Sequence, residues 1–215
     1  MMAEVKKSIV EHKIISIVRG MAPDVCAHLA DAYLEGGVHL MEITFNQAKP
    51  ETWADTQKAI RHLCDHYEGQ ILAGAGTVLT VDQYKMAIDA GAKYIITPVV
   101  NVPVIRAAKE DGVVCMPGAL TPTDVLDAWE AGATFVKLFP AGTFGVKYFK
   151  DVKAPLSHIP LLAVGGISAA NIREFLDAGA VGFGISSALV DKRAIAAGDW
   201  KTIAAAAKEL VDAIS

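Results

Sequence analysis

The chain has 215 residues, of which 53% are hydrophobic and 20% charged, with a formal net charge of −4. This length and composition suit one compact domain over residues 1–215. They exclude a membrane protein of ordinary type, because no apolar run approaches the roughly 20 residues that a membrane-spanning helix needs. An acidic chain without basic runs that carry interleaved aromatic residues gives no case for nucleic-acid binding.

Cysteine usage and the N-terminal segment predict a cytoplasmic protein. Cys26, Cys64 and Cys115 are odd in number and widely spaced, which indicates structural thiols in a reducing compartment. Residues 1–7 are charged and lack the apolar segment and cleavage site of a signal peptide. The histidines and cysteines form no metal-ligand pattern, so we expect no metal and no other cofactor.

A short repeated unit organises the chain. An acidic residue is followed two positions later by glycine, between a helical pattern and an apolar run, in five units that start at Glu35, Asp89, Glu110, Glu130 and Asp177. Each glycine is expected to end a helix in the left-handed conformation. Each apolar run that follows is expected to form a buried parallel strand.

In chain order, strand-like runs lie near residues 14–19, 40–45, 71–77, 94–98, 114–119, 135–140, 161–166 and 181–186. Eight such runs, separated by segments of helical length, predict an α/β fold of the compact (β/α)8, or TIM, barrel type. Residues 2–11 are expected to form an extra N-terminal helix over one barrel end, and 198–214 a closing helix. An open doubly wound sheet is the alternative, disfavoured because no GxGxxG turn follows the first run.

Three helix starts are well marked. Thr80 and Gln83 form a capping-box pattern, and Thr121 precedes a proline at the first helical position. Ser168 is expected to begin the helix that contains Asn171.

A lysine stands inside an apolar strand. The run is Phe135-Val136-Lys137-Leu138-Phe139-Pro140, and burial favours the neutral amine of a lysine, which can attack a carbonyl.

The repeated unit also sets the register of the strands. In the second, fourth, sixth and eighth strand-like runs, the fifth residue after the repeat glycine is Glu42, Ile96, Lys137 and Gly184, respectively. Alternate strands share an interior layer, so Glu42 and Lys137 are expected to point into the same layer, at the strand ends where barrel active sites lie. The alternative is an ion pair that only neutralises the lysine.

Other residues are expected at the carboxyl ends of the strands. Arg19 suits bidentate binding of a carboxylate or phosphate, and Thr77 offers a hydroxyl donor. Gly165, Gly166 and Ser187 are expected at helix starts, where backbone N–H groups bind phosphate. The alternatives are a rim salt bridge for Arg19, a helix cap for Thr77 and tight turns for the glycines.

These residues together indicate a reaction class. A desolvated lysine forms a Schiff base with a ketone, which makes an electron sink for cleavage of an adjacent C–C bond. A carboxylate within reach shuttles the protons.

Six segments carry a resemblance to a known family: Gly36–Phe45, Gly74–Leu79, Ile96–Pro98, Met116–Gly118, Val136–Ala141 and Val164–Ile167. In this order they resemble the 2-keto-3-deoxy-6-phosphogluconate (KDPG) and 4-hydroxy-2-oxoglutarate (KHG) aldolase family, over nearly the whole chain. The resemblance implies a class I, metal-independent aldolase with a (β/α)8 fold, usually a homotrimer. It implies cleavage of a small 2-keto acid phosphate, KDPG, to pyruvate and glyceraldehyde 3-phosphate, and also of 4-hydroxy-2-oxoglutarate to pyruvate and glyoxylate.

The resemblance also implies roles for individual residues. Lys137 would form the Schiff base, and Glu42 would move protons through a water. The implied substrate-binding residues are Arg19, Thr77, Pro98, Phe139, Gly165, Gly166 and Ser187.

One position departs from the family pattern. Many members carry an arginine four residues after the glutamate, where this chain has Asn46. Arg19 would supply the missing guanidinium, and the pair Asn46 with Arg19 resembles aldolases that act on the galactonate epimer, 2-dehydro-3-deoxy-6-phosphogalactonate. Two other readings stay open: a different phosphate-binding barrel enzyme that uses paired carboxylates or a metal, and a non-catalytic sugar-phosphate sensor with this fold.

Overall fold

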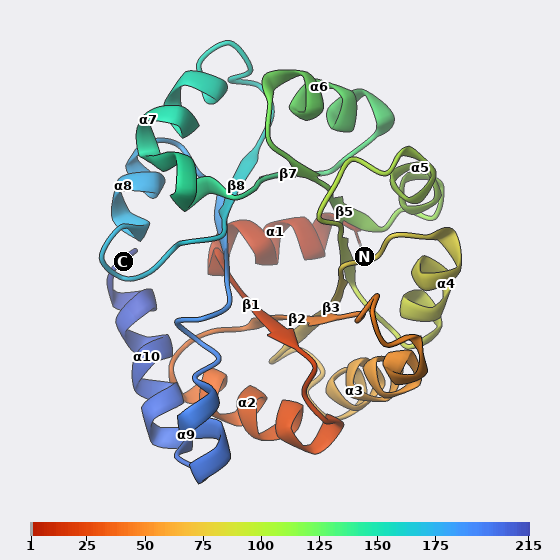
Figure 1. Cartoon of the computed structure of the whole chain (residues 1–215), viewed down its shortest axis with the longest axis vertical. Helices are drawn as coiled ribbons and strands as arrows, with labels where there is room; N and C mark the ends of the chain where they lie inside the picture. Colours follow the sequence, from red (N-terminus) through yellow and green to blue (C-terminus); the bar gives the residue numbers. More distant parts are fainter. Residues whose placement is uncertain (1) are drawn as a thin grey trace.

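A computed structural model describes residues 2–215 as a ring of parallel strands surrounded by helices (Figure 1). The strands are β1 Ile14–Arg19, β2 Leu40–Thr44, β3 Leu72–Gly76, β4 Tyr94–Ile96, β5 Val114–Met116, β6 Gly118–Ala119, β7 Val136–Leu138, β8 Leu161–Val164 and β9 Gly182–Ile185. The helices are α1 Met2–His12, α2 Pro23–Glu35, α3 Trp53–His66, α4 Val81–Asp89, α5 Val102–Glu110, α6 Pro122–Ala131, α7 Ala141–Lys153, α8 Ile172–Asp177, α9 Lys192–Ala197 and α10 Trp200–Asp212, with a 3-10 turn η1 at Pro50–Thr52.

The sheet order confirms a TIM-like barrel and shows that the open doubly wound alternative is wrong. The strands follow one another as β5-β4-β3-β2-β1-β9-β8-β7-β6, all parallel. The two ends of this order belong to one predicted strand, 114–119. Pro117 interrupts it because proline has no N–H for a ladder hydrogen bond. β5 therefore pairs with β4 and β6 with β7, which brings the ring nearly to closure.

The repeated unit has the predicted geometry. The five repeat glycines, Gly37, Gly91, Gly112, Gly132 and Gly179, have φ between 67° and 113°. Each lies directly before an apolar segment that enters the barrel wall. Because all five units end their helices in the same way, they deliver the following strands to the barrel in a common register.

Two of the three predicted helix starts are confirmed. Thr121 and Asp124 form a complete capping box at α6. The Thr80 side chain accepts from the Gln83 N–H, but the Gln83 side chain caps the N–H of Leu79 rather than that of Thr80. The start at Ser168 is wrong, because a turn intervenes and α8 begins only at Ile172.

The predicted N-terminal helix is present as α1, and it lies across the middle of the ring (Figure 1). Its residues Val5 and Ile9 are buried in the same apolar cluster as Ile15, Leu40 and Val114, near the strand beginnings. α1 therefore closes the amino-terminal end of the barrel. The predicted closing helix is α10, which packs on α2. No helix within residues 2–215 is long and apolar enough to cross a membrane.

Candidate active site at the carboxyl ends of the strands

Glu42 and Lys137 are both buried inside the barrel, 1% and 4% exposed. Glu42 lies on β2 and Lys137 on β7. Gly76 of β3 makes room for the carboxyl, since a Cβ at Gly76 would lie 1.6 Å from Oε1 of Glu42. A residue with any side chain at this position would displace the Glu42 carboxyl.

The two buried charges act on each other. Burial raises the pKa of Glu42, and the charges of Lys137 and Arg19 oppose this rise. Burial also lowers the pKa of Lys137; Glu42 opposes this effect and Arg19 adds to it. Nζ of Lys137 lies 5.0 Å from the centre of the Phe139 ring. Because its pKa is lowered, Lys137 loses its proton more readily than an exposed lysine does, and the neutral amine that results is the nucleophilic form.

Arg19 and Thr77 meet at the barrel mouth. Nη1 of Arg19 donates to Oγ1 of Thr77 at 3.2 Å. Thr77 has φ of 56°, a left-handed conformation that strains a β-branched residue. Nε2 of Gln47 donates to the Thr77 carbonyl at 2.7 Å, and the buried Gln83 donates to Oε1 of Gln47 at 2.9 Å. This chain of hydrogen bonds holds the Thr77 backbone in place.

The predicted pocket walls, Pro98 and Phe139, line one cavity of about 340 Å³ together with Gly118 and Leu120. Phe139 is 38% exposed, which is unusual for a phenylalanine two residues from a buried strand position. Its ring therefore faces both the cavity and the amine of Lys137.

The predicted phosphate loops are turns and not helix starts, which corrects the sequence analysis. Gly165 and Gly166 have φ of 87° and 73°. Ser187 lies in a turn in which Val190 N–H donates to the Ser186 carbonyl at 2.8 Å, and α9 begins only at Lys192. Within residues 2–215, the N–H groups of Gly166 and Ser187 have no protein acceptor. Successive N–H groups in such turns make anion-binding concavities without a helix dipole.

The structure adds two cations that the sequence analysis missed. A cavity of about 590 Å³ is lined by Arg19, Ser187, Lys192 and Arg193, with Met21, Ser186, Val190 and Asp191. Asp191 caps α9 by accepting from the N–H groups of Arg193 and Ala194. Arg19, Lys192 and Arg193 make no ion pair with another residue of the described chain. Lys192-Arg193 reads as an ordinary surface pair in the sequence, since only the fold brings it to Arg19.

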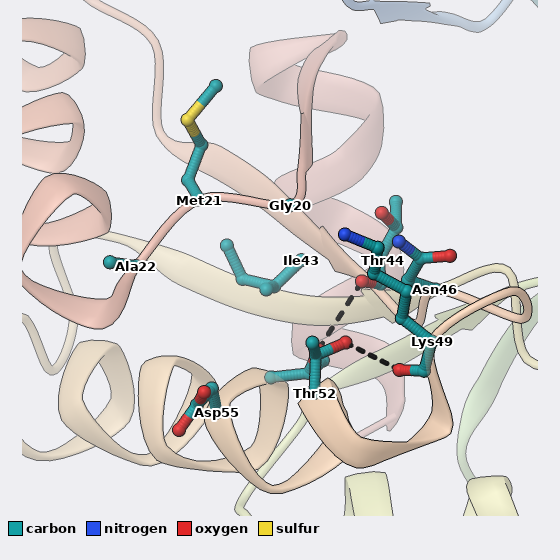
Figure 2. A pocket seen from close by; sticks show the side chains of 10 residues that line it. Gly20, Met21, Ala22, Ile43, Thr44, Asn46, Lys49, Thr52 and Asp55 are labelled. Atoms are coloured by element: carbon teal, nitrogen blue, oxygen red, sulfur yellow. Dashed lines mark hydrogen bonds between the residues drawn. The ribbon is translucent and has the colours of Figure 1, made fainter.

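A third cavity, of about 280 Å³, opens beside the mouth, between the segment after β1 and the segment after β2 (Figure 2). It contains Asn46 and Lys49 but none of the predicted site residues. Oδ1 of Asn46 accepts from the Ala48 N–H at 3.0 Å, so this amide is tied to its own loop. Among residues 2–215, no group of three or more histidine, cysteine or acidic side chains has the arrangement of a metal site.

A family model described as KDPG and KHG aldolase matches residues 5–206. The chain belongs to this family. It is therefore an aldolase, a carbon–carbon lyase, as the sequence analysis predicts.

Individual members of the family are similar to this chain over most of its length and of their own. The chain is 37% identical to 2-dehydro-3-deoxy-6-phosphogalactonate aldolase of Escherichia coli K12, over 82% of this chain and 83% of that one. It is 30% identical to 2-dehydro-3-deoxy-phosphogluconate aldolase of Haemophilus influenzae, over 95% and 93%. A solved structure described as native KDPGal superposes with a TM-score of 0.83 at 34% identity, covering 93% of both chains.

Proposed function

We propose that this aldolase works by the class I mechanism, with Lys137 as the Schiff-base lysine. The observation that carries the proposal is a buried lysine with a lowered pKa beside a buried carboxyl, at the barrel end where TIM-barrel active sites lie. The neutral Nζ attacks the C2 ketone of the substrate, and loss of water gives a protonated imine. The imine accepts the electron pair of the C3–C4 bond as that bond breaks.

Glu42 carries the protons in this proposal. Its carboxylate takes the proton of the C4 hydroxyl through a water, so that the departing fragment leaves as an aldehyde. The same group then returns a proton to C3 of the enamine, and hydrolysis of the imine releases pyruvate and the free lysine. The absence of a partner for Oε2 of Glu42 in the described chain leaves that atom available for this water.

The predicted binding residues would hold the two ends of the substrate. Arg19 and Thr77 supply a guanidinium and a hydroxyl for the carboxylate end, and Pro98 and Phe139 form the walls. The free N–H groups of Gly166 and Ser187, with Gly165, suit the phosphate.

The homotrimer and a single aldolase domain over residues 1–215 also belong to this proposal, and sedimentation equilibrium tests the trimer.

We propose 2-dehydro-3-deoxy-6-phosphogalactonate as the preferred substrate, cleaved to pyruvate and glyceraldehyde 3-phosphate. Two relatives with this name are 37% and 34% identical to the chain, and Asn46 with Arg19 resembles the same branch. The gluconate epimer, KDPG, is the second candidate, because relatives named for it are 30–32% identical. 4-Hydroxy-2-oxoglutarate is the smaller, unphosphorylated candidate, named in the relative KHG/KDPG aldolase.

Initial rates with these three substrates test the proposal, with pyruvate release followed by a coupled lactate dehydrogenase assay. We expect kcat/KM to be largest for the galactonate epimer and smallest for the unphosphorylated compound. A larger value for KDPG would overturn the preferred substrate but not the reaction class. Binding of all three compounds without pyruvate release would instead support the alternative of a non-catalytic sugar-phosphate sensor with this fold.

A further inference from the structure

Tyr94 and Glu42 occupy neighbouring positions inside the barrel. Tyr94 begins β4, and its side chain is fully buried. Its ring covers Gly74, where a Cβ would lie 2.1–2.5 Å from three ring carbons. The Glu42 carboxyl covers Gly76 in the same way. Gly74 and Gly76 are successive inward positions of β3, about 6–7 Å apart, so the phenol and the carboxyl lie at adjacent levels of the interior.

Both side chains carry a buried polar atom without a partner. Within residues 2–215, only three buried side-chain atoms are in this state: the Tyr94 hydroxyl, Oε2 of Glu42 and Oγ of Ser16. Ser16 alternates with the inward-facing Ile15 and Ile17 and so lies on the outer face of β1. The two unpartnered atoms inside the barrel therefore belong to Tyr94 and Glu42. Buried polar groups in folded proteins are almost always hydrogen-bonded, to protein or to ordered water.

Charge and position support a link between them. Burial raises the pKa of Tyr94 well above its usual value, and the charge of Glu42 is the next largest cause, ahead of Cys64. The Met41 backbone, next to Glu42 in the chain, has a smaller effect in the opposite direction and lowers the pKa of Tyr94. The phenol thus stays protonated at any working pH, and it offers an O–H donor below the carboxyl. The other charged groups that act on Glu42 are Lys137 and Arg19.

We propose that Tyr94 is a positioning residue for Glu42, its hydroxyl donating to the carboxylate through one buried water. This hydrogen bond stabilises the charged form of Glu42 and so keeps more of it available as a base. Its importance for catalysis rests on the proposed role of Glu42 as the proton carrier. The link itself is a property of the folded protein.

The test is Tyr94→Phe, which removes the hydroxyl and keeps the ring over Gly74. Carbon-13 NMR of glutamate labelled at Cδ follows the Glu42 titration, assigned by its loss in Glu42→Gln. We expect the apparent pKa of Glu42 to rise by about 0.5–1 unit, the equivalent of one neutral hydrogen bond. This readout does not need turnover, so it stands even if the proposed aldol reaction fails. In the active enzyme, the acid limb of kcat/KM should move to higher pH by the same amount.

Tyr33→Phe is the matched control. Tyr33 is equally buried, but its hydroxyl donates to the Leu189 carbonyl at 3.0 Å outside the barrel interior. This variant should leave the Glu42 titration where it is in the unmodified protein, although it loses a hydrogen bond. An unchanged or lower pKa of Glu42 in folded Tyr94→Phe would overturn the proposal, because the hydroxyl would then be buried without a link to Glu42.

Discussion

The two ends of the barrel differ sharply in what their inward side chains do. At the amino-terminal end, α1 packs Val5 and Ile9 on an apolar layer that includes Leu40 and Val114. Towards the carboxyl end, the same ring of strands encloses the charges of Glu42 and Lys137 beside glycines of β3. One end of the barrel interior is lined by hydrocarbon alone, and the other contains buried ionisable groups.

This difference separates stability from chemistry within one sheet. Apolar burial at the closed end stabilises the barrel, at about 25 cal/mol per Å² of apolar surface removed from water. Burial of charge at the open end is unfavourable, and it shifts the pKa of Glu42 upward and that of Lys137 downward. Substitutions at the two ends should therefore affect different measurements.

The largest effect is expected from Lys137→Met. Without the amine no imine forms, so kcat should fall by about 10³-fold or more while the fold persists. Steady-state assays and thermal unfolding measure the two properties. Lys150→Met, an exposed lysine on α7, is the control and should retain kcat. Comparable losses in both variants would contradict a specific role for Lys137.

Glu42→Gln should separate imine formation from proton transfer. We expect kcat for cleavage to fall by about 10²-fold, less than in Lys137→Met, since the carboxylate no longer moves protons. Glu42 raises the pKa of Lys137, so its loss lowers that pKa and keeps the amine neutral to lower pH. The pH profile of the rate of borohydride trapping with pyruvate should therefore shift to lower pH. An unchanged profile would show that Glu42 does not act on the pKa of Lys137, and a shift to higher pH would show an effect of the opposite sign.

Ile9→Ala tests the closed end. Ile9 is fully buried in α1, and its truncation should reduce the free energy of unfolding by about 2–5 kcal/mol. Because no charge at the open end is touched, kcat of the folded enzyme should stay the same. Urea unfolding and steady-state kinetics provide the comparison. Val10→Ala, 45% exposed on the same helix, should change stability by less than about 0.5 kcal/mol.

The smallest effect is expected from Lys192→Gln combined with Arg193→Gln. These cations line the cavity of Arg19 and Ser187, so their loss should raise KM for a phosphorylated substrate by about 10-fold. KM for 4-hydroxy-2-oxoglutarate should not change. Lys6→Gln with Arg106→Gln removes the same charge from exposed positions on α1 and α5 and serves as the control. Equal effects on both substrates would assign the cations a general electrostatic role.

The sequence predicted the interior of this site better than its rim. Glu42 and Lys137 could be placed because a repeated helix end sets the strand register, and inward positions then recur with period two. The break at Pro117 was hidden in an apolar run that continues on both sides. The turns after β8 and β9 depend on local hydrogen bonds, such as Val190 N–H to Ser186, that leave no periodic signal. Tyr94 reads as an ordinary strand aromatic, and only its buried, unpartnered hydroxyl distinguishes it.

The most direct test of the central claim is chemical trapping of the imine. The protein is incubated with pyruvate and sodium borohydride, digested, and analysed by mass spectrometry. We expect one reduced pyruvate adduct per chain, on the peptide that contains Lys137, and no adduct in Lys137→Met. An adduct on another lysine, or pyruvate release without any trapped adduct, would contradict it.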